Sequence, residues 1–350
     1  MIKQFNNLPS PKGMSREQIM DLLMREEYGY IPEAPESVEI VNENIGWGND
    51  KFCANKAQLL ELVMQCNFKD GRTFSFPFTY MRPKNPDHKY PCFVHMNFDR
   101  AVPNKYQPAE EILDNGFALM SFNLRDITND ITDDFTDGLC GVVFPNGRSN
   151  DTDAGKLILW SWTAMRIMDY IQTLDELDHD EIYVVGHSRL GKAALIAGAL
   201  DTRFACAISN NSGCGGAAIA RNNTGETVES ITRVFPQWFC KNYFKYVDKE
   251  DTMPFDQHFL LAALAGRRVY VASAVDDLWA CPENEYMACV YASQYFEENG
   301  QVGFVHPDRM PVVGDSFHDG NIGYHLREGT HYIGRYDWNE YFKFVKKGKR

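Results

Sequence analysis

The stretch EIYVVGHSRLGKAALIAG, residues 181–198, decides the fold of this chain of 350 residues. Its first part, 182–185, is a short apolar run typical of a strand buried on both faces. The alanines and leucines after Gly191 are strong helix formers. Between the two, Gly186 and Ser188 complete a Gly-x-Ser-x-x-Gly pattern. The sequence therefore predicts a strand that turns sharply into a helix, with a serine at the turn.

Such a turn resembles the nucleophile elbow of serine hydrolases. It holds Ser188 in a strained backbone conformation and lifts the hydroxyl clear of the sheet, and the glycines leave room for the close backbones. The serine would also lie at a helix N-terminus, where free N–H groups and the helix dipole favour a developing oxyanion. The alternative is a serine that merely caps the helix. The strand–turn–helix context favours the nucleophile.

Composition indicates a globular protein and limits its partners. The chain is 44% hydrophobic and 24% charged, and its formal net charge is −13. Large α/β domains of this length are common. The negative charge argues against a general surface for nucleic acid or anionic membrane. We expect neither as a partner, and the sequence leaves the oligomeric state open.

The N-terminus and the cysteines indicate the compartment. The first residues, MIKQFNNLPSPKGMSREQ, lack the apolar core of a signal peptide, and no apolar run is long enough to span a bilayer. A mature chain whose signal peptide has been removed would look the same. The nine cysteines show no CxxC or Cys/His ligand spacing, as in a reducing compartment. We expect a cytoplasmic protein with reduced thiols, no metal and no cofactor.

Alternation of strands and helices predicts the fold class. A capping box at Ser15–Gln18 opens an N-terminal helix, and residues 37–83 alternate like antiparallel edge strands, notably at 37–41, 52–63 and 73–80. Six more continuous apolar runs follow, separated by helical patterns, at 91–98, 117–122, 182–185, 204–209, 268–274 and 323–326. This order predicts a doubly wound, mainly parallel sheet with helices on both faces. We expect one domain, 1–350, with a helix and edge-strand extension over about residues 1–85.

One long stretch shows no periodic pattern. Residues 125–155 are rich in Asp, Asn, Thr and Gly. A loop of this length inside a compact domain is usually functional or mobile. An acidic, solvated excursion is the equally plausible alternative.

Three groups suited to acyl transfer occur in the chain order serine, acid, histidine. Ser188, the pair Asp276 and Asp277, and His331 each follow a strand, and such strand ends meet at one edge of an α/β sheet. An imidazole can take and return the serine proton, and a carboxylate holds its tautomer. Of the two aspartates we prefer Asp277, with Asp276 as the alternative. We discount His187 because adjacent strand residues point to opposite faces.

Five segments resemble the glucuronoyl esterases of carbohydrate esterase family 15. They are GHSRLGKAAL, ISNNSGCGGAA, PFDQHFLLAAL, VASAVDDLWACP and GTHYIGRYDW. The similarity is to the bacterial, acetylxylan esterase-like branch of these α/β hydrolases, and it extends from about Pro91 to the C-terminus. Ser-Arg-x-Gly-Lys is its most specific motif.

The resemblance implies an α/β-hydrolase fold and a reaction. In that family the serine attacks an ester of 4-O-methyl-glucuronic acid, through which lignin alcohols are joined to xylan. Carried over by position, Ser188 is the nucleophile and His331 the base. Arg189 would stabilise the oxyanion through its backbone N–H and its guanidinium. Lys192 would bind sugar hydroxyls, and Trp279 would line the pocket.

The chain departs from the fungal members of that family at the acid. Those members carry a glutamate in the loop after the strand that follows the elbow, where this chain has Asn211. The acid would then be supplied by Asp276 or Asp277.

Other departures concern the sugar contacts. Phe235 stands where the fungal members have a sugar-contacting glutamate, and about Thr227 where they have a glutamine. Glu226 is the expected substitute among the substrate-binding residues. His187 occupies the place of a cysteine beside the nucleophile.

The residue pattern thus predicts a serine esterase, and the resemblance implies that it acts on a small carbohydrate ester, first of all a glucuronoyl ester. Carbohydrate O-deacetylation, as in acetylxylan esterases, is one alternative. A non-catalytic carbohydrate-binding relative is another. Serine, histidine and acid together favour an enzyme, because a binding protein needs none of the three.

Overall fold

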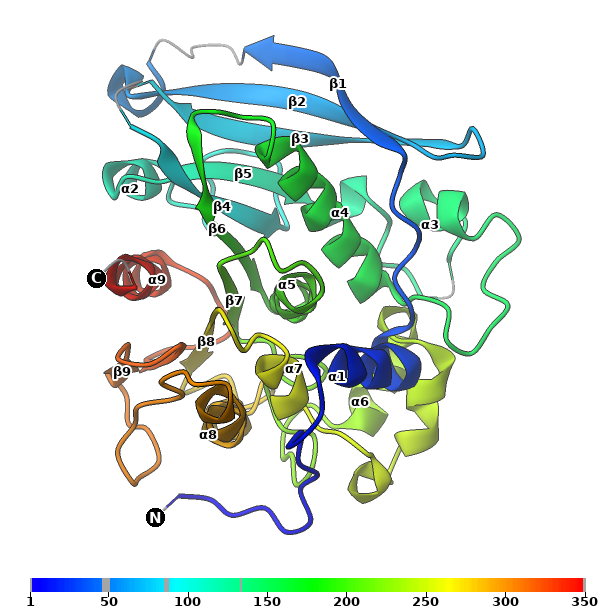
Figure 1. The fold of residues 1–350 in the computed structure, drawn as a ribbon, viewed down its shortest axis with the longest axis vertical. Coiled ribbons are helices and arrows are strands. Elements are labelled where there is room, and N and C mark those ends of the chain that lie inside the picture. Colours follow the sequence, from blue (N-terminus) through cyan, green and yellow to red (C-terminus); the bar gives the residue numbers. More distant parts are fainter. Residues whose placement is uncertain (1, 46–50, 85–87, 133, 349–350) are drawn as a thin grey trace.

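One sheet of ten strands runs through the part of the chain that the structure describes, residues 2–45, 51–84, 88–132 and 134–348. The structure is a computed structural model (Figure 1). The strand order is β1-β2-β3-β5-β4-β6-β7-β8-β10-β9. β4 pairs with β5 on one side and with β6 on the other, so the direction in which strands are added reverses after β5. From β6 on, the chain adds its strands toward the opposite edge of the sheet.

Six parallel strands form the centre of the sheet. They are β5 (Ala118–Asn123), β4 (Tyr90–Asn97), β6 (Leu177–His187), β7 (Cys206–Asn210), β8 (Arg268–Ala274) and β10 (Ile322–Arg327). Every residue of β5 and β7 is buried, as strands covered on both faces require. The predicted mainly parallel α/β sheet is confirmed.

The N-terminal strands extend this sheet on one side in antiparallel fashion. They are β1 (Ser37–Ile45), β2 (Ala57–Asn67) and β3 (Thr73–Pro83), and β3 pairs with β5. In β3 buried and exposed residues alternate, so that Phe74, Phe76 and Phe78 face the core. At the other edge, β9 (Ser316–Phe317) pairs antiparallel with β10.

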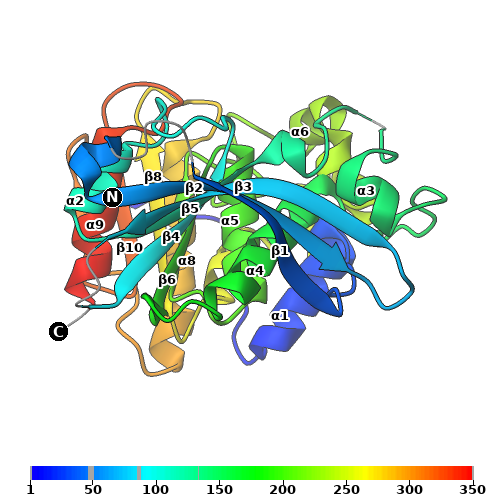
Figure 2. The same ribbon diagram turned by 90° about the horizontal axis from the view of Figure 1, so that it is seen from above.

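Helices cover both faces of the sheet (Figures 1 and 2). One face carries α1 (Arg16–Leu23), α4 (Lys156–Ile171), α5 (Arg189–Leu200), α7 (His258–Ala262) and α8 (Pro282–Glu298). The other carries α2 (Ala109–Asp114) and α9 (Arg335–Lys347). Alternate strand residues separate these two cores: Val184 packs into the first and Val185 into the second. None of the described helices combines the length and apolar character that crossing a bilayer demands.

Short helical segments connect these elements. They are α3 (Gly138–Val143), α6 (Val228–Val234), the π-turn Met24–Tyr28 and the 3₁₀ turns Phe52–Asn55, Leu124–Asp126, Pro236–Trp238, Lys241–Tyr246 and Glu250–Thr252.

The capping box at the start of α1 is confirmed, since the Ser15 hydroxyl accepts from the Gln18 N–H and the Gln18 side chain accepts from the Ser15 N–H. Two local predictions were wrong. Residues 52–55 form a 3₁₀ turn instead of the start of a strand, and α3 lies inside the stretch for which no helix was predicted.

A buried carboxyl group joins α8 to the ends of two central strands. Glu285 accepts hydrogen bonds from the N–H groups of Ser212 (2.8 Å) and Gly213 (3.0 Å), just after β7, and from the hydroxyl of Ser273 (2.6 Å) in β8. Burial raises the pKa of Glu285 to about 7, against these hydrogen bonds, which favour the charged form. The carboxyl fixes the start of the loop that follows β7.

This raised pKa predicts a pH dependence of stability. The folded chain binds the Glu285 proton more tightly than the unfolded chain. The resulting stabilisation is therefore complete below the ordinary glutamate pKa and is lost as the pH rises through about 7. When the pH is raised from 5 to 8, the free energy of unfolding measured with urea should fall more for the wild type than for Glu285→Gln. Glu283→Gln is the control, because Glu283 is exposed in the first turn of the same helix. Equal losses in wild type and Glu285→Gln would contradict the assignment.

Candidate active site

Ser188 lies at a tight turn between β6 and α5. Its backbone has φ 60° and ψ −130°, and its N–H donates to the carbonyl of Asn210 on the neighbouring strand (2.8 Å). A Cβ at Gly186 would collide with the carbonyl oxygen of Leu190, so only glycine fits there. Gly191 is less confined, because a Cβ there would lie 3.1 Å from the Gly186 carbonyl oxygen and from the Ser209 hydroxyl. The predicted strand–turn–helix geometry is confirmed.

Asp277 and His331 meet although 54 positions separate them in the sequence. Nδ1 of His331 lies 2.6 Å from Oδ2 of Asp277, whose side chain is 4% exposed, whereas that of His331 is 42% exposed. With Asp277 ionised, Nδ1 carries the proton and Nε2 is left as the acceptor that a general base needs. Asp276, the alternative acid, is exposed and lies outside the cavity wall described below.

A second donor supports the same carboxylate. Nδ2 of Asn211 donates to Oδ2 of Asp277 (2.7 Å), and the N–H of Ala280 lies 3.4 Å from Oδ1. Burial works against the charged form of Asp277, but the hydrogen bonds from His331 and Asn211 hold its pKa below the ordinary value. The asparagine that replaces the fungal glutamate is thus a partner of the acid.

A cavity of about 240 Å³ brings the predicted residues together. All seven of them line it: Ser188, Arg189, Lys192, Glu226, Asp277, Trp279 and His331. Five residues that sequence reasoning did not assign to the site complete its wall: Asn211, Ser212, Phe235, Trp238 and Ala280. No group of His, Cys, Asp and Glu side chains within the described ranges is arranged to hold a metal ion.

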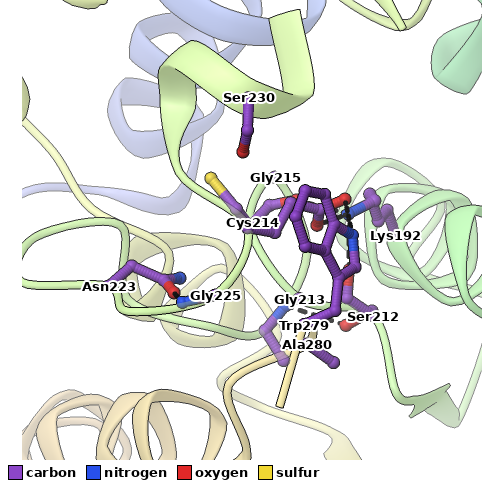
Figure 3. A network of polar contacts seen from close by, with 12 residues as sticks. Lys192, Ser212, Gly213, Cys214, Gly215, Asn223, Gly225, Ser230, Trp279 and Ala280 are labelled. Atoms are coloured by element: carbon purple, nitrogen blue, oxygen red, sulfur yellow. Dashed lines mark hydrogen bonds and ion pairs between the residues drawn. The ribbon is translucent and has the colours of Figure 1, made fainter. Parts of the chain in front are cut away.

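The contacts of Lys192 differ from the sugar-binding role that the family resemblance implied. Its ammonium donates to the carbonyls of Ser212 (2.5 Å) and Cys214 and to Oε2 of Glu226 (2.7 Å), so all three N–H groups are used (Figure 3). The side chain is only 2% exposed. Lys192 therefore anchors Glu226 and the loop after β7, and its donors are not free for a sugar hydroxyl.

Glu226 in turn connects Lys192 to Trp279. Oε1 of Glu226 accepts from the indole N–H of Trp279 (3.0 Å), and the Glu226 N–H donates to the Trp279 carbonyl (2.8 Å). Lys192 from α5 and Trp279 from the loop after β8, both labelled in Figure 3, thus bind the two oxygens of one carboxylate. Trp279 is 47% exposed. The cavity thus presents a carboxylate and an aromatic face to a ligand.

Arg189, the first residue of α5, is paired outside the triad. Its guanidinium donates to the carboxylate of Asp130, which belongs to the stretch without periodicity. Sequence reasoning missed this partner, because nothing in the residue pattern relates two positions 59 apart.

His187 lies closer to the site than alternation along a strand predicts. Its ring centroid is 4.4 Å from that of His331, and its Nδ1 lies 2.6 Å from Oδ1 of Asn210. It does not line the cavity that contains Ser188, and the contact with Asp277 is made by His331. Burial first, and the neighbouring His331 second, lower the pKa of His187 to about 3. His187 is therefore a neutral neighbour of His331. Its place next to Ser188 in the sequence was the signal that could have indicated this proximity.

A family model described as "Glucuronyl esterase, fungi" matches residues 67–300. Among curated relatives, carbohydrate esterase MZ0003 from an unknown prokaryotic organism is 44% identical over 191 residues, covering 55% of this chain and 44% of the relative. A 4-O-methyl-glucuronoyl methylesterase of Podospora anserina is 27% identical over 301 residues, covering 81% of this chain and 56% of the relative. The chain thus spans about half the length of these two relatives.

Solved structures match over the whole chain. A glucuronoyl esterase from Solibacter usitatus has a TM-score of 0.87 at 29% identity and covers 100% of this chain and 99% of its own. A promiscuous CE15 esterase from a marine bacterial metagenome has a TM-score of 0.84 at 27% identity, with 99% and 98% covered. The α/β-hydrolase fold implied by the sequence is shown by these likenesses.

The hydrogen bond between Asp277 and His331 predicts which aspartate matters. If Ser188 carries out acyl transfer, Asp277→Asn should lower kcat by roughly 10⁴-fold, because an amide at this position favours the wrong tautomer of the imidazole. Asp276→Asn is the matched control and should stay near the wild-type rate. Steady-state hydrolysis of 4-nitrophenyl acetate measures both. A greater loss in Asp276→Asn would transfer the role to that residue.

Proposed function

Because the chain belongs to the glucuronyl esterase family, we propose that it hydrolyses glucuronoyl esters, including those of 4-O-methyl-glucuronic acid, with Ser188 as the nucleophile. The observation that carries the proposal is the Asp277–His331 hydrogen bond in the cavity that Ser188 lines. An acid, an imidazole and a strained serine at parallel strand ends are the parts that acyl transfer to a serine requires.

The first half of the reaction forms the acyl-enzyme. His331 accepts the Ser188 proton at Nε2 while Oγ attacks the ester carbonyl carbon. Asp277, held ionised by its partners, stabilises the imidazolium through Nδ1. The backbone N–H of Arg189, at the start of α5, and its guanidinium stabilise the oxyanion. The tetrahedral intermediate expels the alcohol, which takes its proton from His331.

The second half releases the uronic acid. His331, again neutral, accepts a proton from water, and the hydroxide equivalent attacks the carbonyl of the serine ester. Collapse of this second intermediate breaks the bond to Oγ, which receives its proton from His331. The products are the free uronate and the free enzyme.

The cavity wall supports a sugar acid as the acyl group. Trp279 offers a half-exposed indole face for a pyranose ring, and Glu226, in the cavity wall, holds the indole N–H of Trp279. Lys192 compensates the charge of Glu226 at 2.7 Å.

The test compares substrates with the purified chain. Benzyl glucuronate should be hydrolysed with a higher kcat/KM than acetylated xylo-oligosaccharide, and Ser188→Ala should reduce turnover of both by roughly 10⁴-fold or more. Faster release of acetate would favour the carbohydrate O-deacetylase. Absence of turnover in the wild type, together with binding of the oligosaccharide, would favour the non-catalytic relative.

Trp279 supplies a sharper test of the acyl group. Trp279→Ala should lower kcat/KM on benzyl glucuronate by roughly 10–100-fold, because ring contact and the orientation of Glu226 are both lost. Hydrolysis of 4-nitrophenyl acetate should change little. Leu278→Ala is the control, since Leu278 is adjacent, 72% exposed and not part of the cavity wall. Equal losses on both esters in Trp279→Ala would count against a uronoyl acyl group.

A further inference from the structure

Asp130 joins the stretch 125–155, which has no periodic pattern in the sequence, to the residue after the nucleophile. One oxygen, Oδ2, accepts from the guanidinium of Arg189. The other, Oδ1, accepts from the indole N–H of Trp238 (2.7 Å) and the side-chain amide of Gln237 (3.0 Å). The Asp130 side chain is 10% exposed. Its carboxylate therefore has a donor on each oxygen and no freedom to rotate.

Arg189 is held on one side and free on the other. Its guanidinium lies over the rings of Trp238 (4.7 Å to the centroid) and Phe235 (5.1 Å). Its Nε is buried and has no hydrogen-bond partner among the described residues, although Arg189 lines the cavity that contains Ser188. A buried N–H without a partner is costly, so its retention beside a nucleophile points to a partner that forms during the reaction.

The segment that carries Asp130 is itself fixed by a buried lysine. Lys156, at the start of α4 and fully buried, donates to the carbonyls of Asn129 (2.9 Å) and Ile131 (3.1 Å), which flank Asp130 on either side. It also donates to the Asn129 side chain (2.8 Å). Asp137 adds a hydrogen bond from the Asn129 N–H (2.7 Å). The backbone is thus held by hydrogen bonds on both sides of Asp130.

We propose that Asp130 is a positioning residue that fixes the Arg189 guanidinium so that its free N–H faces the oxyanion formed at Ser188. The inference rests on the proposed esterase function. An arginine side chain has several rotatable bonds, and a donor that must be ordered during the reaction stabilises a transition state less than one already in place. The backbone around Asp130 would then be the part of the fold that orders the donor.

The inference predicts a selective effect on turnover. Asp130→Asn keeps an acceptor for Trp238 but removes the charge that holds Arg189, and should lower kcat on benzyl glucuronate by roughly 10–100-fold with KM little changed. Asp134→Asn is the matched control. Asp134 lies four residues further along and accepts from Asn129 (2.5 Å), and among the described residues no interaction joins it to Arg189. Its variant should keep at least half of the wild-type kcat.

A double-mutant cycle identifies the route of the effect. Arg189→Met will itself be slow, and in that background Asp130→Asn should cause no further loss beyond about twofold. The proposal is overturned if the two losses multiply, if Asp130→Asn equals the wild type, or if Asp134→Asn falls as far as Asp130→Asn. Circular dichroism and thermal unfolding show whether each variant is folded.

A second measurement tests the role of Asp130 independently of the proposed substrate. A fluorophosphonate forms a bond from phosphorus to the Ser188 oxygen with loss of fluoride, and its phosphoryl oxygen occupies the same oxyanion site. Labelling of Ser188 should slow by roughly 10-fold or more in Asp130→Asn and not in Asp134→Asn. If the wild type is labelled but hydrolyses no glucuronate ester, the proposed function fails while this comparison still decides the role of Asp130.

Discussion

One backbone conformation, φ 60° at Ser188, sets the arrangement of the whole site. A non-glycine residue in this region costs of order 1–3 kcal/mol and persists only where its surroundings leave no alternative. Here the hydrogen bond to the Asn210 carbonyl, the close approach of Gly186 to Leu190 and the buried start of α5 supply that constraint. The serine is thereby directed over the strand ends, and the acid after β8 and the histidine after β10 are brought to it by the register of parallel strands.

Two ion pairs and the hydrogen-bonded pair of His331 and Asp277 surround the serine. Arg189 faces Asp130, Lys192 faces Glu226, and His331 faces Asp277, and each carboxylate also accepts at least one hydrogen bond from a neutral donor. Buried pairs of this kind add little to stability on balance, because desolvation offsets their attraction. Their effect is to fix geometry: each partner has one orientation in which its hydrogen bonds are satisfied.

The sequence predicted those parts of the fold and site that depend on local pattern. The elbow at Ser188 and the serine–acid–histidine order follow from strand ends, and the preference for Asp277 over Asp276 agrees with the contact that Asp277 makes with His331. The partners of Lys192 could not be predicted, because two of them are backbone carbonyls and leave no trace in residue type. The Arg189–Asp130 pair could not be predicted either, because it depends on the hydrogen bonds by which the buried Lys156 holds a segment without periodicity.

The sheet has two free edges, and both are poorly suited to adding another strand. β9 is two residues long, and β1 carries Glu39 and Glu43 and is interrupted by a bulge between Ile40 and Asn42. Short strands, charges and bulges at an edge prevent the continuous ladder of hydrogen bonds that joins chains into aggregates. Growth of the described ten-stranded sheet into a continuous intermolecular one is therefore disfavoured at both ends.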